Sequence, residues 1–367
     1  MSSRDTSKSD RESAAGPPLS DRERDVLRFL VQRFIETAGP VGSRSLVKQY
    51  GLDLSAASVR NTMSDLEDMG YLGHPYTSAG RVPTELGYRT FVDELMQRPE
   101  LSPVERQMLK VQLARLVSDT DEMLRESSQL LGQLTNLLGL ALSPSLSTGV
   151  LERLDIVPLP SSRLMVVLSV RGGLVKTIML EFESELQRPA LDRIVSILNE
   201  RLAGLTLQEI RETHEERVRD IDDQTGIVRL ILDESALIFS EPAEGRLQHG
   251  GTQNLLSQPE FQQPDNVRHL LEVIEDEGFV VHLLEDIVTS NLDETGQVAV
   301  SIGSESSSEE VEPYSIVLSP YQMGGSIGTL GVIGPTRMDY GRVMALVENM
   351  ASVLNRPDSD LPAADAA

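Results

Sequence analysis

The sequence predicts an α+β protein with a helical N-terminal region and antiparallel strands in its later part. In residues 19–98 the apolar residues recur mostly at helical spacing, with a short strand pair near 71–83. From residue 150 the spacing is strand-like, after residue 185 it is helical, and near residue 298 it is strand-like again. Strands on both sides of a helical block predict a β-domain that is interrupted by an insertion.

The composition predicts two or three domains and no membrane segment. The chain has 367 residues, more than one typical domain. It contains no cysteine, which excludes disulfides and thiolate metal sites. The polar start of the chain lacks the apolar core of a signal peptide, and no apolar run approaches the roughly 20 residues of a spanning helix. We therefore expect a soluble cytoplasmic protein with no membrane partner and with disordered tails at 1–18 and 356–367.

Four helices are predicted in the N-terminal region, the last of which begins at Thr84 after the strand pair and runs to about Met96. Ser20 begins an S-x-x-E capping box and so starts the first helix. Ser43 is expected to cap a second helix over residues 44–50, and Ser55 a third over residues 56–69. Two short helices in this order, separated by a tight turn, are typical of a helix-turn-helix.

The third helix has a polar face that is suited to reading DNA bases. Val59 and Met63 define its buried face, and small or polar residues lie on the opposite side. Arginine can bind guanine and asparagine can bind adenine through two hydrogen bonds each. The acidic residues come only in the later turns, so we expect the N-terminal end to enter the major groove; a merely solvated amphipathic helix is the alternative. The candidates for base contacts on this helix are Ser58, Arg60, Asn61 and Ser64, and the small Ala57 would let the backbone approach the DNA closely.

A short hairpin follows this helix and predicts a winged helix-turn-helix. The strand over residues 71–75 and the returning strand over 81–83 flank a turn at 77–80. Arg81, at the base of this wing, suits a phosphate or minor-groove contact, with a solvated arginine as the alternative. The candidates for phosphate contacts from the helices and their caps are Arg44, Lys48 and Ser55, and Ser43 is a further DNA-binding candidate beside them.

The formal net charge of −24 at first opposes DNA binding, because phosphate neutralisation dominates the affinity. The charge is unevenly distributed, however. Residues 40–90 contain five Lys or Arg and five Asp or Glu, so this segment is neutral. We expect a modest affinity per copy, which a dimer on two half-sites would raise.

The rest of the chain is predicted to contain helices and strands in alternating blocks. Ser102 begins a second capping box, and the amphipathic run to about residue 139 is interpreted as a connecting helix, with a coiled coil or a helix packed on its own domain as alternatives. The acidic, serine-rich stretch 303–313 is expected to be a solvated hairpin loop. Strands are expected at 149–159, 163–171, 174–182, 298–302, 314–321 and 326–333, and helices at 189–203, 206–220, 225–239, 264–277 and 337–354.

No catalytic, cofactor or metal site is predicted. Residues 324–328 match the G-x-S-x-G elbow of hydrolases around Ser326. In those hydrolases the histidine follows the serine along the chain, whereas the last histidine here is His282. Ser326 also begins a strand-like run instead of lying between a strand and a helix. P-loops, dinucleotide-binding glycine motifs and metal-spaced clusters do not occur in the sequence, so we expect no enzyme activity.

Three separate motifs make the chain resemble the HrcA family, the heat-inducible transcription repressors of bacteria. The first spans residues 41–93, from VGSRS to YRTFVD. The second is GGTQNLLSQPEF at 250–261, and the third is GTLGVIGPTRMDYGRVMALVE at 328–348. The resemblance extends over nearly all of the chain, from about residue 19 to about residue 354.

The resemblance implies a homodimeric repressor of chaperone operons of the groE and dnaK type. Family members bind an inverted repeat in double-stranded DNA called CIRCE, and their activity depends on the GroE chaperonin. The alternative is a GAF-domain regulator of other genes that senses a small ligand, for which the sequence offers no binding motif. The expected domains are the tails at 1–18 and 356–367, a winged-helix DNA-binding domain at 19–98, a connecting helix at 102–142, a GAF-like domain at 150–184 plus 292–355, and an inserted dimerisation domain at 185–290.

Overall fold

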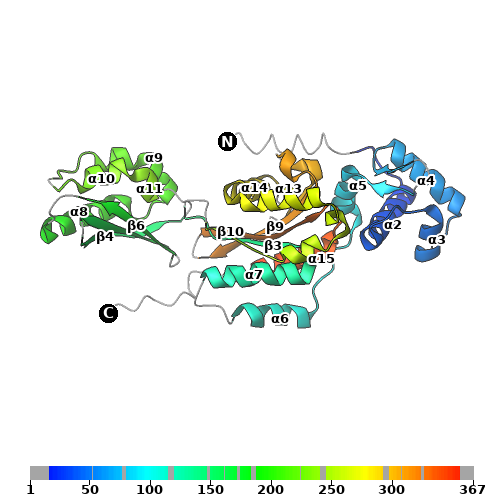
Figure 1. Cartoon of the computed structure of the whole chain (residues 1–367), viewed down its shortest axis with the longest axis horizontal. Helices are drawn as coiled ribbons and strands as arrows, with labels where there is room; N and C mark the ends of the chain where they lie inside the picture. The colour runs from blue at the N-terminus through cyan, green and yellow to red at the C-terminus, as the bar shows by residue number, and fades with distance from the viewer. Residues whose placement is uncertain are drawn as a thin grey trace. The chain divides into compact units, whose positions relative to one another are not determined.

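The chain is a mixed α+β protein with helices at its N-terminus and antiparallel sheets, as the sequence predicts (Figure 1). It is described here from a computed structural model and divides into two compact units, each treated by itself. Unit 1 contains Met1–Ala141, Gln248–Ser319 and Leu330–Ala351, and unit 2 contains Leu142–Leu247, Pro320–Thr329 and Ser352–Ala367. The residues that the structure describes are 16–51, 53–76, 80–114, 120–146, 149–160, 162–171, 174–182, 187–223, 225–239, 245–291, 297–306, 308–323 and 326–355.

The N-terminal part of unit 1, Asp21–Leu95, is called the head. Its helices pack around buried apolar residues of α2 and α4, among them Leu27, Leu30, Val59 and Leu66. Its elements are α2 (Asp21–Thr37), α3 (Ser43–Tyr50), α4 (Ala56–Asp68), β1 (Leu72–Gly73), β2 (Val82–Pro83), α5 (Glu85–Thr90) and the π-helical turn η1 (Phe91–Leu95).

Most helix boundaries in the head are those that the capping residues predict. Ser20 and Glu23 form the complete capping box of α2, and the Thr84 hydroxyl accepts a hydrogen bond from the Gly87 N–H at 3.2 Å at the start of α5. One cap was predicted one residue too late. Gly42 is the N-cap of α3, and Ser43 is the first helical residue with a buried side chain.

Two packed helices connect the head to the main sheet of unit 1. They are α6 (Pro103–Ala114) and α7 (Thr120–Thr135), and they contact each other. The Ser102 hydroxyl accepts a hydrogen bond from the Glu105 N–H at 3.2 Å, which confirms the predicted capping box. The predicted helical run to about residue 139 is wrong at its end, because Leu138–Leu142 form strand β3, buried along its whole length.

The main sheet has five strands in the order β7-β3-β10-β9-β8. Figure 1 shows α13 and α14 on one side of it and α7 on the other, which agrees with the burial of β3. The elements of this part are β7 (Leu247–Gly250), α12 (Thr252–Leu256), η2 (Pro259–Phe261), α13 (Pro264–Glu275), α14 (Glu277–Asn291), β8 (Ala299–Ile302), η3 (Gly303–Glu305), η4 (Glu309–Val311), β9 (Tyr314–Met323), β10 (Ser326–Pro335) and α15 (Tyr340–Leu354).

Unit 2 has its own sheet and its own hydrophobic core. Strands β4, β5 and β6 pair antiparallel in sequence order, and they lie where strands are predicted at 149–159, 163–171 and 174–182. Gly172 and Gly173, between β5 and β6, lie outside the described residues. One face of this sheet packs against the helices that follow it, so the strands predicted for the GAF-like domain share a core with helices of the predicted insertion. The elements are β4 (Leu151–Leu159), β5 (Arg163–Val170), β6 (Leu174–Glu181), α8 (Arg188–Leu202), α9 (Leu207–Val218), α10 (Ile227–Asp233) and α11 (Ser235–Phe239).

The stretch 303–313 differs from the solvated loop that its composition predicts. It contains the two 3₁₀ turns η3 and η4, and the Val311 side chain is buried. Glu305 forms an ion pair with Arg89 of the head. Residues 1–15 and 356–367 of the predicted tails, the turn at 77–79 and the two glycines before Ser326 lie outside the described residues. The last residues of the predicted N-terminal tail are described, and the Tyr71 hydroxyl donates a hydrogen bond to the Pro17 carbonyl at 2.6 Å.

Candidate nucleic-acid interface

Helix α4 presents the predicted set of polar residues to solvent. Its start is fixed by Ser55, whose hydroxyl accepts a hydrogen bond from the Ser58 N–H at 3.0 Å. Val59 and Met63 are buried in the head, as predicted. Because a helix advances about 100° per residue, Arg60 and Asn61 face outward, whereas Thr62 is buried beside Met63. The residues that are exposed on this outer face are Ala57, Arg60, Asn61 and Ser64, and Ser58 is half-buried.

The cations beside this face are available for an anion. Arg44 and Lys48 on α3 are exposed, as is Arg60 on α4. In the described part of the chain, none of these three side chains has an ion-pair partner. The first turn of α4 also carries no acidic residue, so its unpaired N–H groups add positive potential there. Ser43, in contrast, is only 7% exposed, and its side chain cannot contribute in this arrangement.

The Arg81 side chain, at the base of the β1–β2 pair, already has an acidic partner within the head. Its guanidinium forms an ion pair with Glu67 of α4 at 2.6 Å, and the side chain is 25% exposed. Glu67 also pairs with His74 on the other side of the hairpin, a contact that the sequence analysis missed. The position of Arg81 follows from its backbone, because its N–H and C=O exchange hydrogen bonds of 2.9 and 2.8 Å with Val41.

Gly80 permits this backbone contact. A Cβ atom at this position would overlap the backbone of Val41, so a larger residue would push the hairpin away from the segment before α3. The hairpin is therefore tied to the rest of the head at its base.

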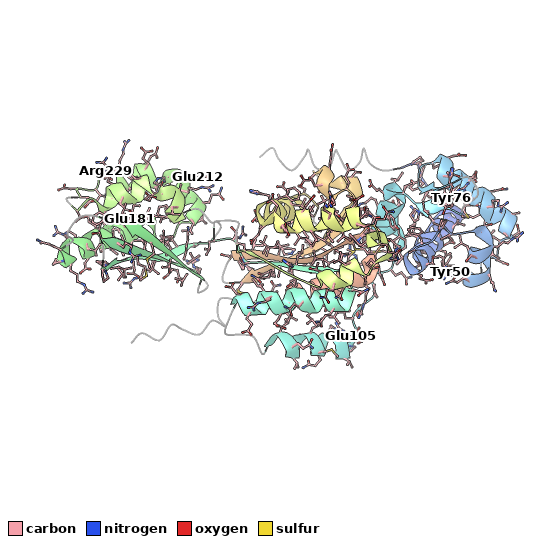
Figure 2. All side chains as sticks on the ribbon, in the orientation of Figure 1. Tyr50, Tyr76, Glu105, Glu181, Glu212 and Arg229 are labelled. Atoms are coloured by element: carbon pink, nitrogen blue, oxygen red, sulfur yellow. The ribbon has the colours of Figure 1, made fainter. Side chains whose placement is uncertain are left out.

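Tyr76 is an exposed aromatic residue of the hairpin that the sequence analysis did not single out. Its side chain is 66% exposed, the second-largest exposed fraction among the exposed large apolar residues described. Figure 2 shows it on the head, beside α4. A position next to a predicted turn was the only signal available from the sequence.

The described residues offer no alternative site of metal chemistry and no membrane segment. Among them, no group of three or more His, Cys, Asp or Glu side chains is placed to hold a metal ion. Within the same residues, no helix has both the length and the apolar character that are needed to cross a membrane.

Comparison with known proteins gives a family match and close relatives with a common name. The family model described as "HrcA protein C terminal domain" matches residues 121–344. The heat-inducible transcription repressor HrcA of Chlorobium phaeobacteroides (strain BS1) is 41% identical to this chain over 351 residues, which cover 92% of this chain and 97% of that protein. The protein of the same name from Chlorobium luteolum (strain DSM 273 / BCRC 81028 / 2530) is also 41% identical over 351 residues, with coverages of 94% and 98%.

A solved structure has a similar fold. It is described as "Crystal structure of a hypothetical protein at 2.2 A resolution", and it superposes with a TM-score of 0.53 at 24% sequence identity, covering 92% of this chain and 98% of that one. The similarity supports the mixed α+β fold over nearly the whole chain. The two Chlorobium relatives carry the name of transcription repressors and not of enzymes, which agrees with the prediction that this chain has no catalytic role.

Proposed function

This chain belongs to the HrcA family of heat-inducible transcription repressors, and on that premise we propose that it represses heat-shock chaperone operons of the groE and dnaK type. In this proposal it acts in the cytoplasm as a homodimer on a CIRCE-type inverted repeat. The observation that carries the proposal is the outer face of α4, where Arg60 and Asn61 are exposed beside cations without ion-pair partners.

We interpret the head as a winged helix-turn-helix. In this interpretation α3 and α4 form the helix-turn-helix, and β1 and β2 form the wing. Arg44, Lys48 and Ser55 would contact phosphates, and the exposed face of α4 would contact base edges. Arg81 would approach the DNA backbone while it is paired with Glu67. The negative charge of Glu67 then lowers the net contribution of Arg81 to the affinity for DNA. Ser43 would serve in packing, because its side chain is buried.

We interpret the five-stranded main sheet with its helices as the GAF-like domain, and the part of unit 2 from β4 to α11, residues 151–239, as the inserted dimerisation domain. The expected insertion at 185–290 then shifts toward the N-terminus, to the limits of the core that β4–β6 share with α8–α11. This shift follows from packing, because the strands bury one face against those helices.

The other face of the β4–β5–β6 sheet supports a dimer through this domain. Val157 of β4, Val175 of β6 and Met179 of β6 are 39%, 59% and 53% exposed. Val157 and Met179 lie directly opposite Met165 on β5, so the three form one apolar row across the sheet. Apolar area of this kind favours burial against a second copy in an isologous contact.

The dependence on a chaperonin would act through folding. A repressor that needs the chaperonin to stay folded loses its operator when unfolded proteins occupy that chaperonin during heat shock. We expect operator binding of refolded protein to rise with added GroE. Equal binding with and without GroE, in protein shown to be folded, would contradict this part of the proposal.

A binding titration tests the core of the proposal. Purified protein is titrated on a duplex with the complete inverted repeat, on a duplex with one half-site, and on a scrambled duplex, at two salt concentrations. We expect selective binding that needs both half-sites and weakens as salt rises. Equal weak binding to all three duplexes by folded protein would refute the repressor function and lead to a ligand screen.

The dimer contact is tested separately. Met179→Asp should convert the dimer to monomers in sedimentation analysis, because it places a charge in the apolar row of the exposed sheet face. Leu237→Asp is the matched control, since Leu237 is 52% exposed on α11 of the same unit. If both variants remain dimeric, dimerisation uses another surface.

A further inference from the structure

A polar contact joins helix α5 of the head to strand β8 and the turn that follows it. The guanidinium Nε of Arg89 donates to Oε1 of Glu305 at 2.7 Å, and its Nη2 also pairs with the other carboxylate oxygen. The same Nη2 donates to the Val300 carbonyl at 2.9 Å, and Nη1 donates to Asp93 of the head at 3.1 Å. Burial alone would lower the pKa of Arg89, but the hydrogen bonds and charges of Glu305 and Asp93 raise it above its usual range.

A second contact lies one turn earlier on α5. The carboxylate of Glu85 accepts hydrogen bonds from the Ser304 N–H at 3.1 Å and from the Ser304 hydroxyl. The neighbouring Gly303 has φ of +58°, and a Cβ atom there would overlap the Glu85 carboxylate. The turn is therefore shaped to receive this side chain, and Glu305 is held in it by the Ile302 N–H at 2.9 Å.

A third contact holds the other end of the head. Arg337, before α15, donates from Nη1 to the Ile35 carbonyl near the end of α2 at 2.8 Å. Its Nε donates to Glu260 at 2.7 Å, so the guanidinium is itself fixed within the same compact unit. We call the contacts of Arg89 with Glu305, Glu85 with Ser304, and Arg337 with Ile35 the head clamp.

The head clamp matters because packing alone leaves the junction incomplete. A cavity of about 710 Å³ lies beside it, with walls that include Phe29 and Tyr50 of the head, Arg98 and Pro99 of the linker, and Asp339 and Gly341 near α15. A continuous apolar interface would hold the head without polar help. Here the covalent linker and the packing of Tyr88 on Tyr340 of α15, with ring centroids 6.0 Å apart, attach the head close to α5. The clamp adds directional contacts on α5 and, at the far end of the head, on α2, which together fix an orientation.

We propose that the head clamp sets the separation of DNA half-sites that the protein accepts, with Arg89 and Glu305 as its central positioning residues. This inference rests on the proposed dimer and its inverted repeat. In B-DNA one base pair changes the separation of two half-sites by about 3.4 Å and their relative rotation by about 35°. Two rigidly held heads cannot follow such a change, whereas two heads on a loosened clamp can.

The experiment measures spacing preference as well as affinity. Wild-type protein and Glu305→Gln are titrated on inverted repeats whose spacer is natural, one base pair longer or shorter, and two base pairs longer. For the wild type we expect each altered spacer to weaken binding about tenfold or more, as part of the avidity of the second head is lost. For Glu305→Gln we expect the ratio of the affinity for the natural spacer to the affinity for an altered spacer to be at least threefold smaller than in the wild type.

Matched controls separate this effect from general damage. Asp93→Asn removes a partner of Arg89 that lies within the head, and Glu94→Gln removes the surface ion pair with Arg24. Both leave the head clamp in place and should keep the wild-type ratio. Ser304→Ala removes only the hydroxyl contact with Glu85, and it serves as a second test if Glu305→Gln lowers the melting temperature too far.

The outcomes separate a failure of the proposed repressor function from a failure of the proposed role of the head clamp. If the wild type does not bind the inverted repeat, or binds one half-site as well as two, the proposed function fails. If the wild type binds with a clear spacing preference, and Glu305→Gln and Ser304→Ala keep that preference unchanged, the proposed function stands and the role of the head clamp is refuted. A wild type that needs both half-sites but tolerates every spacer equally also refutes the clamp.

Discussion

Replacing Arg60 with alanine separates base recognition from folding at the candidate interface. The Arg60 side chain is exposed, while its neighbour Val59 and the residue one turn later, Met63, are buried. The substitution therefore leaves the core of the head intact, and the free energy of unfolding should change by no more than about 0.5 kcal/mol. A lost two-point contact to a base should cost about 1–3 kcal/mol of binding free energy per half-site, or roughly 5–150-fold in affinity.

The assay is fluorescence anisotropy on the operator and on variants with one base pair changed at a time. Arg60→Ala should bind the natural operator more weakly and should also lose discrimination at one position of each half-site. The matched control is Arg229→Ala, which removes an equal charge from α10, where the side chain is 87% exposed (Figure 2). If Arg60→Ala weakens every operator variant by the same factor, the assignment of the base-reading face is wrong.

Three further predictions concern the head and its connection to the sheet. Lys48→Ala should weaken all DNA sequences alike and flatten the slope of log affinity against log salt by about one, as measured in salt titrations. Ser55→Ala removes the cap of α4 and should lower the free energy of unfolding by about 0.5–2 kcal/mol in urea titrations. Ser64→Ala is the control, because it removes an exposed hydroxyl of the same helix that caps no helix end. Hydrogen bonds from Arg342 and the capping serine lower the pKa of Glu105 from about 4.5 to about 2, so this carboxylate stabilises the folded state above pH 4.5 and loses that effect as the pH falls toward 2. The destabilisation caused by Glu105→Gln, measured by chemical denaturation across this range, should therefore be largest near neutral pH and shrink in acid.

Local sequence signals were sufficient to predict most helices and strands, because the interactions that define these elements join residues only a few positions apart. The capping box at Ser20 and the cap at Ser55 each involve a partner three residues away. The error at α3 has the same local origin. Gly42 adopts the extended conformation of an N-cap, and the Ser43 side chain is buried in the head. Which of the two neighbours becomes the cap depends on how Ser43 packs against the rest of the head.

Long-range pairs explain what the sequence could not show. The stretch 303–313 looks like a solvated acidic loop, yet the partner of Glu305 is Arg89, which is 216 residues away. Arg81 looks like a free cation of the wing, but Glu67 neutralises it after the hairpin folds back on α4. The predicted helix that ends at Glu277 continues as α14, because Asp276 caps a new helix by accepting from the Phe279 N–H at 2.9 Å.

In the proposed dimer, the acidic charge of the chain and the head clamp would both raise the specificity for the operator. Residues 40–90 are neutral, so the formal charge of −24 lies elsewhere in the chain and repels DNA that is not held by the heads. Because screening limits this repulsion to about 8–10 Å in physiological salt, it weakens non-specific contacts with the acidic parts more than contacts through α3 and α4. In the proposed dimer, affinity would then come from two heads that engage their half-sites together, and the orientation of each head would be part of the recognition. Such a repressor would gain specificity from a fixed spacing between its DNA half-sites and from weak non-specific DNA binding, without a strongly basic surface.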